Sequence, residues 1–188
     1  MSSFYSQEEL KEIGFASVGE NVCISKKASI YGAKMIKLGN NVRVDDFCII
    51  SGHVEIGNYV HISAYTGLFG GDVGIYISDY VSVSSKNCIY AISDDYSGEG
   101  MTNPMVPDRF RKVTAKQVVL EKHVIIGSGG CVLPGVIIGE GAAVAAMSLV
   151  NKNLEPWKIY GGVPCKQIKE RKKNILDLEN KLKADYPE

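Results

Sequence analysis

The chain has 188 residues, of which 45% are hydrophobic and 22% charged, which are ordinary values for one soluble domain with a sizeable core. Lys+Arg and Asp+Glu both number 21, so the formal net charge is zero, which argues against a partner bound chiefly through bulk charge, such as nucleic acid. We expect a cytoplasmic protein without a membrane span, since no secretory signal or long apolar stretch is present and the 5 cysteines form no C-x-x-C pair.

The segment SQEELKEIGF predicts a short helix within residues 1–15. Ser6 is in position to cap its N-terminus, Glu9 stands three residues later as in a capping box, and Gly14 would end it. We expect this helix to cover the open end of the repeat that follows, because the terminal units of a solenoid must hide exposed core.

A six-residue repeat of aliphatic side chains fills most of residues 16–165. Six residues make one short strand plus one turn, and three such units close a triangular coil whose stacking buries a column of apolar side chains. The sequence therefore predicts an all-β fold, a left-handed parallel β-helix shaped as a three-sided prism. The longest runs of the repeat are Leu38, Val44, Ile50, Ile56, Ile62 and Leu68, and Leu120, Ile126, Val132, Ile138, Val144 and Val150.

The repeat is interrupted at three places and is followed by a tail. Two short phase slips occur, the second of them between Leu68 and Ile77. Residues 90–119 predict a protruding loop, and an excursion of about thirty residues is more often functional than accidental. The tail, residues 166–188, predicts a charged C-terminal helix with an apolar stripe formed by Ile168, Ile175, Leu178 and Leu182.

The repeat, the loop and the closing segment IYGGVPCKQIKER together resemble the hexapeptide-repeat acyltransferases, most closely the maltose, galactoside and xenobiotic acetyltransferase group. The likeness spans about residues 18–171. It implies an acetyl-CoA-dependent enzyme that needs no metal and acts on a sugar or sugar nucleotide. A role in surface-polysaccharide biosynthesis is a further implication of the resemblance. It also implies a homotrimer with its sites between subunits.

The general base is the main departure from this family. In the resembled sugar O-acetyltransferases it is a histidine five residues after the last aliphatic position before the loop. Counted from Ile89, that position is Asp94, and the loop has no histidine. In one mechanism Asp94 is the base, which suits an amine acceptor because a carboxylate holds an ammonium and takes its proton. In the other, His61 or His53 is the base.

Further candidate residues belong to these two mechanisms and to the acceptor site. In the histidine mechanism, Asp94 or Asp95 orients the imidazole or the acceptor. His61 is favoured among the histidines because the phase slip after SAYTGLFGG predicts a second small loop beside it. A zinc hydratase is disfavoured, since the histidine spacing does not match that class. Candidate acceptor contacts, besides His53, are Tyr96, Asn103, Met105 and Arg109.

The donor site is predicted in the last coils, where small residues let a pantetheine arm lie along the prism. By likeness, the Gly-x-Pro of the closing motif borders the adenine end of coenzyme A, and basic residues after it meet the phosphates. The candidates are Gly129, Ala145, Ala146, Gly162, Val163, Pro164, Lys166, Lys169 and Arg171.

Residues and resemblance together predict an acetyl-CoA-dependent acetyltransferase that acts on a sugar hydroxyl. The alternative is an N-acetyltransferase of an amino-sugar nucleotide. A second alternative is a non-catalytic β-helix assembly module, which the missing loop histidine allows. The acceptor, the base and the length of the acyl group stay open.

Overall fold

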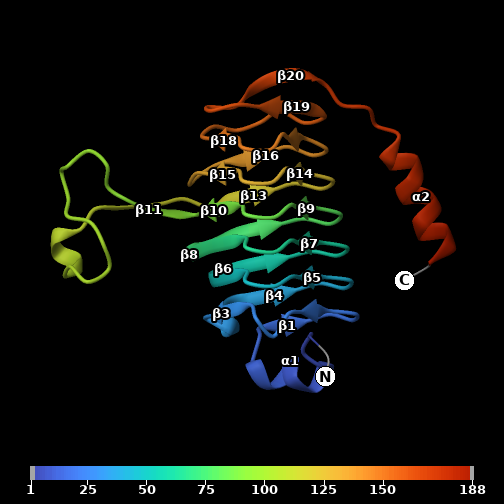
Figure 1. The fold of residues 1–188 in the computed structure, drawn as a ribbon, viewed down its shortest axis with the longest axis horizontal. Coiled ribbons are helices and arrows are strands. Elements are labelled where there is room, and N and C mark those ends of the chain that lie inside the picture. Colours follow the sequence, from blue (N-terminus) through green and yellow to red (C-terminus); the bar gives the residue numbers. More distant parts are fainter. Residues whose placement is uncertain (1–2, 187–188) are drawn as a thin grey trace.

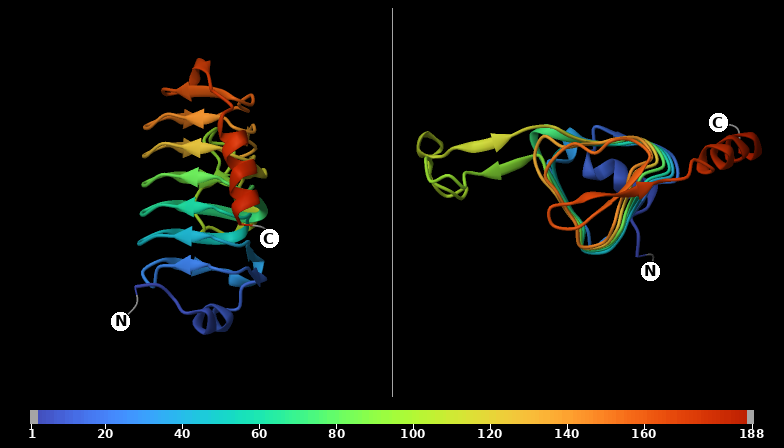
Figure 2. Two further views of the ribbon diagram at one scale, coloured as in Figure 1. Left: turned by 90° about the vertical axis from the view of Figure 1, so that its right-hand side faces the viewer. Right: turned by 90° about the horizontal axis from the view of Figure 1, so that it is seen from above.

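The computed structural model describes residues 3–186 and shows a three-sided prism of stacked coils (Figure 1). Seen from above in Figure 2, the coils superpose as nested triangles. Each coil adds short parallel strands to the sheets that form the sides. The expected left-handed parallel β-helix is confirmed.

The three faces are named A, B and C in the order in which the chain crosses them. Face A holds β2 (Cys23–Ile24), β5 (Arg43–Val44), β7 (His61–Ile62), β9 (Ser82–Val83), β14 (Ile125–Ile126), β17 (Ala143–Val144) and β19 (Lys158–Gly161). Face B holds β3 (Ser29–Tyr31), β10 (Cys88–Tyr90), β15 (Cys131–Val132), β18 (Leu149–Val150) and the first halves of β6 (Ile49–Ile56) and β8 (Gly67–Ile77). Face C holds β1 (Ser17–Val18), β4 (Ile36–Leu38), β13 (Val118–Leu120), β16 (Ile137–Ile138) and the second halves of β6 and β8.

The six-residue repeat places its aliphatic side chains inside the prism. Val44 pairs with Ile62, which pairs with Val83 on the next coil. All three side chains are 0% exposed. Burying one such side chain contributes about 1.5–3 kcal/mol, so this continuous column is the main source of stability.

Helix α1 (Gln7–Ile13) covers the lower end of the prism, as expected (Figure 1). The capping box is present, with the Glu9 N–H donating to Ser6 Oγ at 3.2 Å and the Ser6 N–H donating to Glu9 Oε2 at 2.7 Å. Gly14 ends the helix with a φ of 79°. Leu10 is 0% exposed and joins the core.

The C-terminal segment begins as a strand, so the expectation of a helix from residue 166 is wrong at its start. Lys166–Glu170 forms β20, antiparallel to β19 on the last coil, and helix α2 (Ile175–Asp185) follows. The strand pairs with an edge that an α-helix would leave open. Residues 1, 2, 187 and 188 of the expected terminal segments lie outside the described residues. No helix within residues 3–186 has the length and apolar character needed to cross a membrane.

A buried carboxylate fastens α2 to the prism at the corner between faces C and A. Glu179 is 7% exposed, and it accepts from Lys122 Nζ at 2.6 Å and from His123 Nε2 at 2.7 Å. Lys183 adds an ion pair at 2.7 Å. Burial alone would raise the pKa of Glu179, but the hydrogen bonds from Lys122, Lys183 and His123 outweigh it and lower the pKa to about 2.

Replacing Glu179 by glutamine is expected to release α2 while the prism stays folded. Breaking a buried charged network costs about 3–5 kcal/mol. Because the folded pKa is depressed, this stabilisation is present above the ordinary value of 4.5 and is lost as the pH falls toward about 2. Amide hydrogen exchange of α2, compared with that of β10, measures the release. Asp177→Asn, an exposed change on the same helix, is the control, and unchanged protection of α2 in the Glu179 variant would contradict the account.

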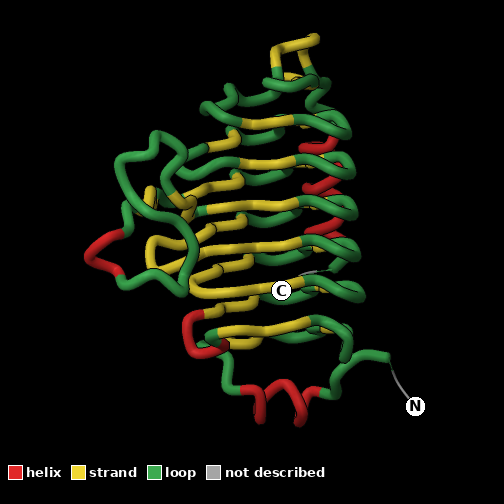
Figure 3. The backbone as a smooth tube through the Cα atoms, turned by 60° about the vertical axis from the view of Figure 1, so that its left-hand side comes forward, coloured by secondary structure: helices red, strands yellow, loops and turns green. Residues whose placement is uncertain are grey.

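All the large departures from the repeat fall at the corner between faces B and C. The first slip forms the 3-10 turn Ala33–Met35, and Figure 3 shows that turn on the same side of the prism as the protruding loop. The second slip is absorbed within β8 at Gly71 and Gly74, whose φ values are 54° and 94°. The expected second small loop beside His61 is therefore wrong, because His61 lies on face A and the extra residues lengthen a strand elsewhere.

Candidate active site

The corner between faces A and B carries a column of small and polar residues, each placed directly after a face A strand. Their backbone N–H groups donate to the coil above at 2.8–3.0 Å, for example Ser63 to Val83 and Ser84 to Ile126 at 2.9 Å. Neighbouring coils lie about 4.8 Å apart, so these residues form one continuous strip along the prism. The corner column consists of Asp45, Ser63, Ser84, Gly127 and Ala145.

The upper part of this corner brings together most of the residues predicted to bind coenzyme A. Ala145 and Ala146 are exposed, and a Cβ on Gly161 would lie 3.1 Å from the Ala145 Cβ. The Gly162 N–H donates to Ser148 Oγ at 3.1 Å. The corner therefore presents small side chains over about three coils, with the Met147 side chain, 71% exposed, standing among them. The predicted residues found here are Gly129, Ala145, Ala146, Gly162, Val163 and Pro164.

The three predicted basic residues separate into two kinds. Lys166 and Lys169 are exposed on β20, just beyond the upper corner. Arg171 instead donates to the carbonyls of His123 and Gly141, both at 2.9 Å. Burial lowers the pKa of Arg171. Its guanidinium therefore ties coils together, and only the two lysines are placed to meet a ligand.

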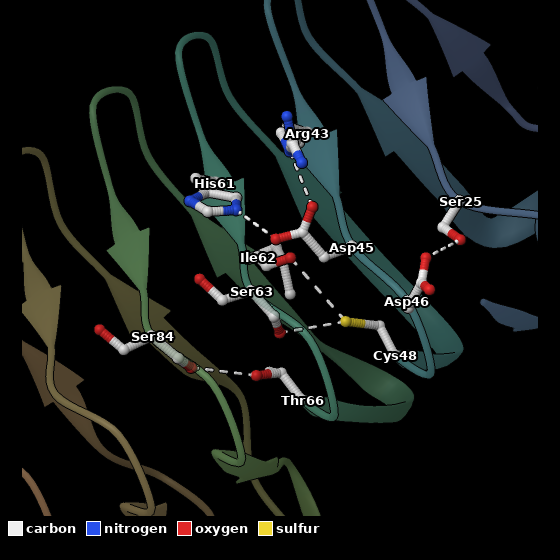
Figure 4. Close-up of polar contacts among 10 residues, drawn as sticks. All are labelled: Ser25, Arg43, Asp45, Asp46, Cys48, His61, Ile62, Ser63, Thr66 and Ser84. Carbon is white, nitrogen blue, oxygen red and sulfur yellow. Dashed lines mark hydrogen bonds and ion pairs between the residues drawn. The ribbon is translucent and has the colours of Figure 1, made fainter. Parts of the chain in front are cut away.

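At the lower end of the corner column, Asp45 holds the side chain of His61 on the adjoining face A (Figure 4). We call this end the lower corner, and the sequence did not single out its carboxylate. His61 Nε2 lies 2.7 Å from Asp45 Oδ2, and Arg43 Nε donates to Asp45 Oδ1 at 2.7 Å. Burial alone would raise the pKa of Asp45, but the hydrogen bonds from His61 and Arg43 outweigh it and lower the pKa. His61 is thus oriented by Asp45, and the structure does not bring it to Asp94 or Asp95 of the same chain.

His53 lies on a different part of the prism. Its Nε2 is 2.9 Å from Glu55 Oε1, and its ring meets Tyr76 edge-on at 5.2 Å between centroids. Lys37 also donates to Glu55, at 3.0 Å. These partners belong to face C, so His53 and His61 do not share a site.

Asp94 lies at the neck of the protruding loop, at the end of β11 (Ile92–Asp94), which pairs antiparallel with β12 (Val113–Ala115). Its Oδ2 accepts from the Asn103 N–H at 3.0 Å, and its Oδ1 lies 3.5 Å from an Arg111 terminal nitrogen. The side chain is 35% exposed. The carboxylate is therefore held in place and still accessible to a ligand.

Asp95 shapes the loop and does not orient a base. Its carboxylate accepts from Ser97 Oγ at 2.8 Å and from the N–H groups of Glu99 at 2.9 Å and Gly100 at 3.1 Å. The Ser97 hydroxyl and these N–H groups lower the pKa of Asp95 to about 2. Both oxygens are used in a turn of the kind aspartate commonly forms, so the predicted catalytic role of Asp95 has no support in the geometry.

The other loop candidates lie beyond the β11–β12 pair, and Asn103 among them contacts Asp94 through its backbone N–H. Tyr96 is 95% exposed and Met105 is 90% exposed. Asn103 Oδ1 accepts from the Met105 N–H at 3.0 Å, and the Arg109 guanidinium covers the Phe110 ring at 4.7 Å. Figure 2 shows the loop extending away from the prism, so these side chains are presented to whatever lies beside the chain.

The sequence analysis missed Asp45, Ser63 and Ser84, although a signal was present. Each stands directly after an inward aliphatic residue, where the repeat often has glycine. A polar side chain at that position has to project from the corner. Within the described residues, no group of three or more His, Cys, Asp or Glu side chains is placed to hold a metal ion.

Known proteins share the six-residue repeat. The family model described as bacterial transferase hexapeptide (six repeats) matches residues 35–70. A dTDP-4-amino-4,6-dideoxy-D-glucose acyltransferase of Escherichia coli is 46% identical over 184 residues, covering 96% of this chain and 95% of that protein. The chain belongs to the hexapeptide-repeat acyltransferases. The expected resemblance and the expected enzyme class are thereby confirmed.

Solved structures of one relative contain a nucleotide together with coenzyme A or an acyl-CoA. AntD, an N-acyltransferase from Bacillus cereus in complex with dTDP and 3-hydroxybutyryl-CoA, is 54% identical to this acyltransferase with a TM-score of 0.97, covering 100% of both chains. Another AntD structure, at 54% identity and a TM-score of 0.96 over 98% of this chain and 99% of that one, holds dTDP-4-amino-4,6-dideoxyglucose and coenzyme A. AntD has also been crystallised as S84A and D94N variants, and this chain has Ser84 and Asp94 at the same numbers.

A relative of lower identity is named as an O-acetyl transferase. The putative lipopolysaccharide biosynthesis O-acetyl transferase WbbJ of Escherichia coli (strain K12) is 29% identical over 156 residues, covering 78% of this acyltransferase and 74% of WbbJ. Transfer to a sugar hydroxyl was the main prediction from the sequence. The full-length relatives at higher identity favour the stated alternative, which is transfer to an amino-sugar nucleotide.

Proposed function

We propose that this acyltransferase moves an acyl group from coenzyme A to the 4-amino group of dTDP-4-amino-4,6-dideoxyglucose. The observation that carries the proposal is Asp94, an accessible carboxylate at the loop neck where the resembled O-acetyltransferases have a histidine. One relative named for this sugar nucleotide and another crystallised with it match nearly the whole chain, which supports the choice of acceptor.

Asp94 supplies the two things that an amine acceptor needs. The amine arrives as an ammonium ion, which a carboxylate attracts, and it must lose a proton before it can attack. Asp94 takes that proton, and the nitrogen lone pair then forms a bond to the thioester carbonyl carbon. When the tetrahedral intermediate collapses, the C–S bond breaks, the nitrogen gives up its second proton and coenzyme A leaves as a thiol. Asp94 then returns its proton to water.

Coenzyme A is proposed to lie along the upper corner, over Gly129, Ala145 and Ala146 toward Gly162, Val163 and Pro164. Small side chains there let a pantetheine arm approach backbone groups closely. Lys166 and Lys169 are exposed at the same end of the prism, where they can meet phosphates. The acyl group itself, acetyl or longer, belongs at the lower end of this strip, next to Ser84.

Ala146→Gln tests this placement. A long side chain at the exposed corner is expected to raise the KM for the acyl-CoA donor at least about tenfold while the melting temperature stays the same, because it blocks space without disturbing the core. Ala16→Gln is the matched control, since Ala16 is also exposed but lies at the other end of the prism. An unchanged donor KM in the Ala146 variant would place coenzyme A elsewhere.

The active assembly is proposed to be a trimer with its sites between subunits. Within one chain, the loop neck and the corner column lie at opposite edges of face B, because β10 separates Ser84 from Asp94. Ser84 and Asp94 nevertheless belong to the same coil. Rotation about a threefold axis parallel to the prism keeps height, so it brings the partner's Asp94 to the level of Ser84.

Face B has the apolar surface that such an assembly requires. Its inward side chains, such as Ile50 and Ile89, are 0% exposed, and strand alternation turns their neighbours outward. Phe69 and Tyr90 stack there at 5.0 Å between ring centroids. The outward residues include Tyr31, Ile49, Phe69, Cys88, Tyr90, Cys131, Leu133 and Leu149, with Ser29, Ser51 and Gly67 between them.

Release of coenzyme A thiol across a panel of acceptors tests the proposed reaction. The panel contains dTDP-4-amino-4,6-dideoxyglucose, a free galactoside and a free amino sugar, each with acetyl-CoA and with 3-hydroxybutyryl-CoA. We expect release with the nucleotide-linked amine at a kcat/KM at least about 100-fold above the other acceptors. Fastest release with the galactoside would instead support transfer to a hydroxyl. If no combination gives thiol release and coenzyme A does not bind, the results would support the non-catalytic assembly module.

A further inference from the structure

One carboxylate in the lower corner holds two nitrogen-rich side chains side by side. Arg43 and His61 are register partners on β5 and β7, and both make 2.7 Å contacts with Asp45. Asp45 is 20% exposed, whereas Arg43 is 57% and His61 43% exposed. The carboxylate thus lies beneath the pair, and the pair faces solvent (Figure 4).

This arrangement leaves the outer donors free for a ligand. Arg43 uses Nε on Asp45, which leaves its two terminal NH₂ groups for other acceptors. His61 uses Nε2, so its Nδ1 is the nitrogen available to a ligand. The Arg43 guanidinium also covers the Phe4 ring at 5.1 Å, which further fixes its plane. A fixed guanidinium fork beside an imidazole is suited to phosphate oxygens.

The neighbouring acidic group does not oppose an anion here. Asp46 is paired with Lys27 Nζ at 2.8 Å and accepts from Ser25 Oγ at 2.5 Å. Asp45 is likewise balanced by Arg43, whose Nε donates to it at 2.7 Å. Neither carboxylate therefore presents an uncompensated negative charge to the ligand.

The position of the cluster matches the length of the acceptor. The proposed reacting centre is at the level of Ser84, and coenzyme A occupies the corner above it. The acceptor must therefore extend downward, past Ser63 toward Asp45, which lies two coils below Ser84. Two coil spacings are roughly 10 Å, about the span from the C4 nitrogen of a hexose across its ring to the phosphates on its anomeric oxygen.

We infer that Arg43 and His61, aligned by Asp45, form the binding subsite for the diphosphate of the acceptor nucleotide sugar. The inference rests on the proposed function, which supplies the acceptor class. It gives His61 a role in binding, in place of the role as a base that the sequence suggested. It also makes the nucleotide-linked sugar preferable to the free sugar, because only the former reaches the cluster.

Calorimetric titration with dTDP tests the subsite, using the native enzyme, Arg43→Gln and His61→Gln. Lys37→Gln is the control, because Lys37 makes a similar surface ion pair, to Glu55, on face C. We expect dTDP affinity to fall about tenfold or more in Arg43→Gln and severalfold in His61→Gln. Coenzyme A affinity should stay native in all three variants. Arg43→Lys should recover only part of the loss, since a point charge lacks the fork.

Two different outcomes would overturn the inference, and they are distinguishable. If the native enzyme binds dTDP and both corner variants bind it equally well, the diphosphate lies elsewhere while the proposed function stands. If the native enzyme binds coenzyme A but not dTDP, the nucleotide acceptor itself is wrong and the subsite falls with it. In the activity assay, the expected loss in Arg43→Gln appears in the KM for the nucleotide sugar, with kcat close to native.

Discussion

Asp94→Asn is expected to lower kcat for acyl transfer by about 10²–10⁴-fold, the usual contribution of a general base. The amide has the shape of the carboxylate but neither its charge nor its ability to accept the ammonium proton. Affinity for coenzyme A should remain native, because the donor corner is a different part of the prism. Steady-state rates of thiol release, together with calorimetric titration of coenzyme A, measure both quantities.

The loop provides a matched control for this substitution. Asp108 is 96% exposed and also pairs with Arg111, at 3.1 Å, so Asp108→Asn removes a carboxylate from the same arginine without touching the proposed base. We expect near-native turnover in Asp108→Asn. Turnover in Asp94→Asn within about threefold of native would assign the proton transfer to another group and remove the main support for amine acylation.

Ile49→Glu is expected to separate the trimer and abolish most of the activity. Ile49 lies on the outer side of face B and is 37% exposed in the single chain, so a glutamate there is solvated in a free monomer. In a trimer the same glutamate is buried against a neighbour, at a cost of several kcal/mol per copy. The variant should therefore fold as single chains of 20.4 kDa, whereas the native protein should have three times that mass.

Activity should fall with the assembly, because no single chain brings its own Asp94 to its own corner column. Light scattering after gel filtration gives the mass, and thiol release gives the activity. Ile137→Glu is the control, since Ile137 is an isoleucine of similar exposure, 41%, on face C. A monomeric Ile49 variant with native turnover would show that each chain holds a complete site.

Mixing two impaired variants sharpens this test, when the rates are measured with acyl-CoA well below the donor KM of the Ala146→Gln variant. Subunits carrying Asp94→Asn keep an intact donor corner, and subunits carrying Ala146→Gln keep an intact base. If sites form between subunits, mixed trimers recover part of the activity that each parent lacks. Recovery is impossible when the base and the donor corner of one site come from the same chain.

The interior of the fold was predictable from the sequence, because each core position repeats every six residues. Val44, Ile50 and Ile62 fall on this six-residue step, and all three are 0% exposed, as the spacing alone predicts. The capping box at Ser6 and Glu9 was equally readable, since it involves residues three apart. Local and periodic features of this kind require no knowledge of the other coils.

The outer surface was not predictable in the same way, because its contacts join different coils. His61 contacts Asp45 because the register of β5 and β7 brings neighbouring coils together. The six-residue pattern of apolar residues does not predict which polar side chains meet in this way. The positive charge of Arg171 predicted a contact with the phosphates of coenzyme A. In the structure its guanidinium donates to carbonyls of two earlier coils, which disfavours that contact. Asp95 resembled a catalytic neighbour of Asp94 until the turn that uses both its oxygens was seen.

The choice between hydroxyl and amine is the central question, and one paired measurement tests it most directly. The rates of acylation of dTDP-4-amino-4,6-dideoxyglucose and of the same nucleotide sugar with a hydroxyl at C4 are compared, with mass analysis of the products. The account predicts one acyl group added to the amine, and a kcat/KM for the hydroxyl compound at least about 100-fold lower. Equal or faster acylation of the hydroxyl compound would contradict it.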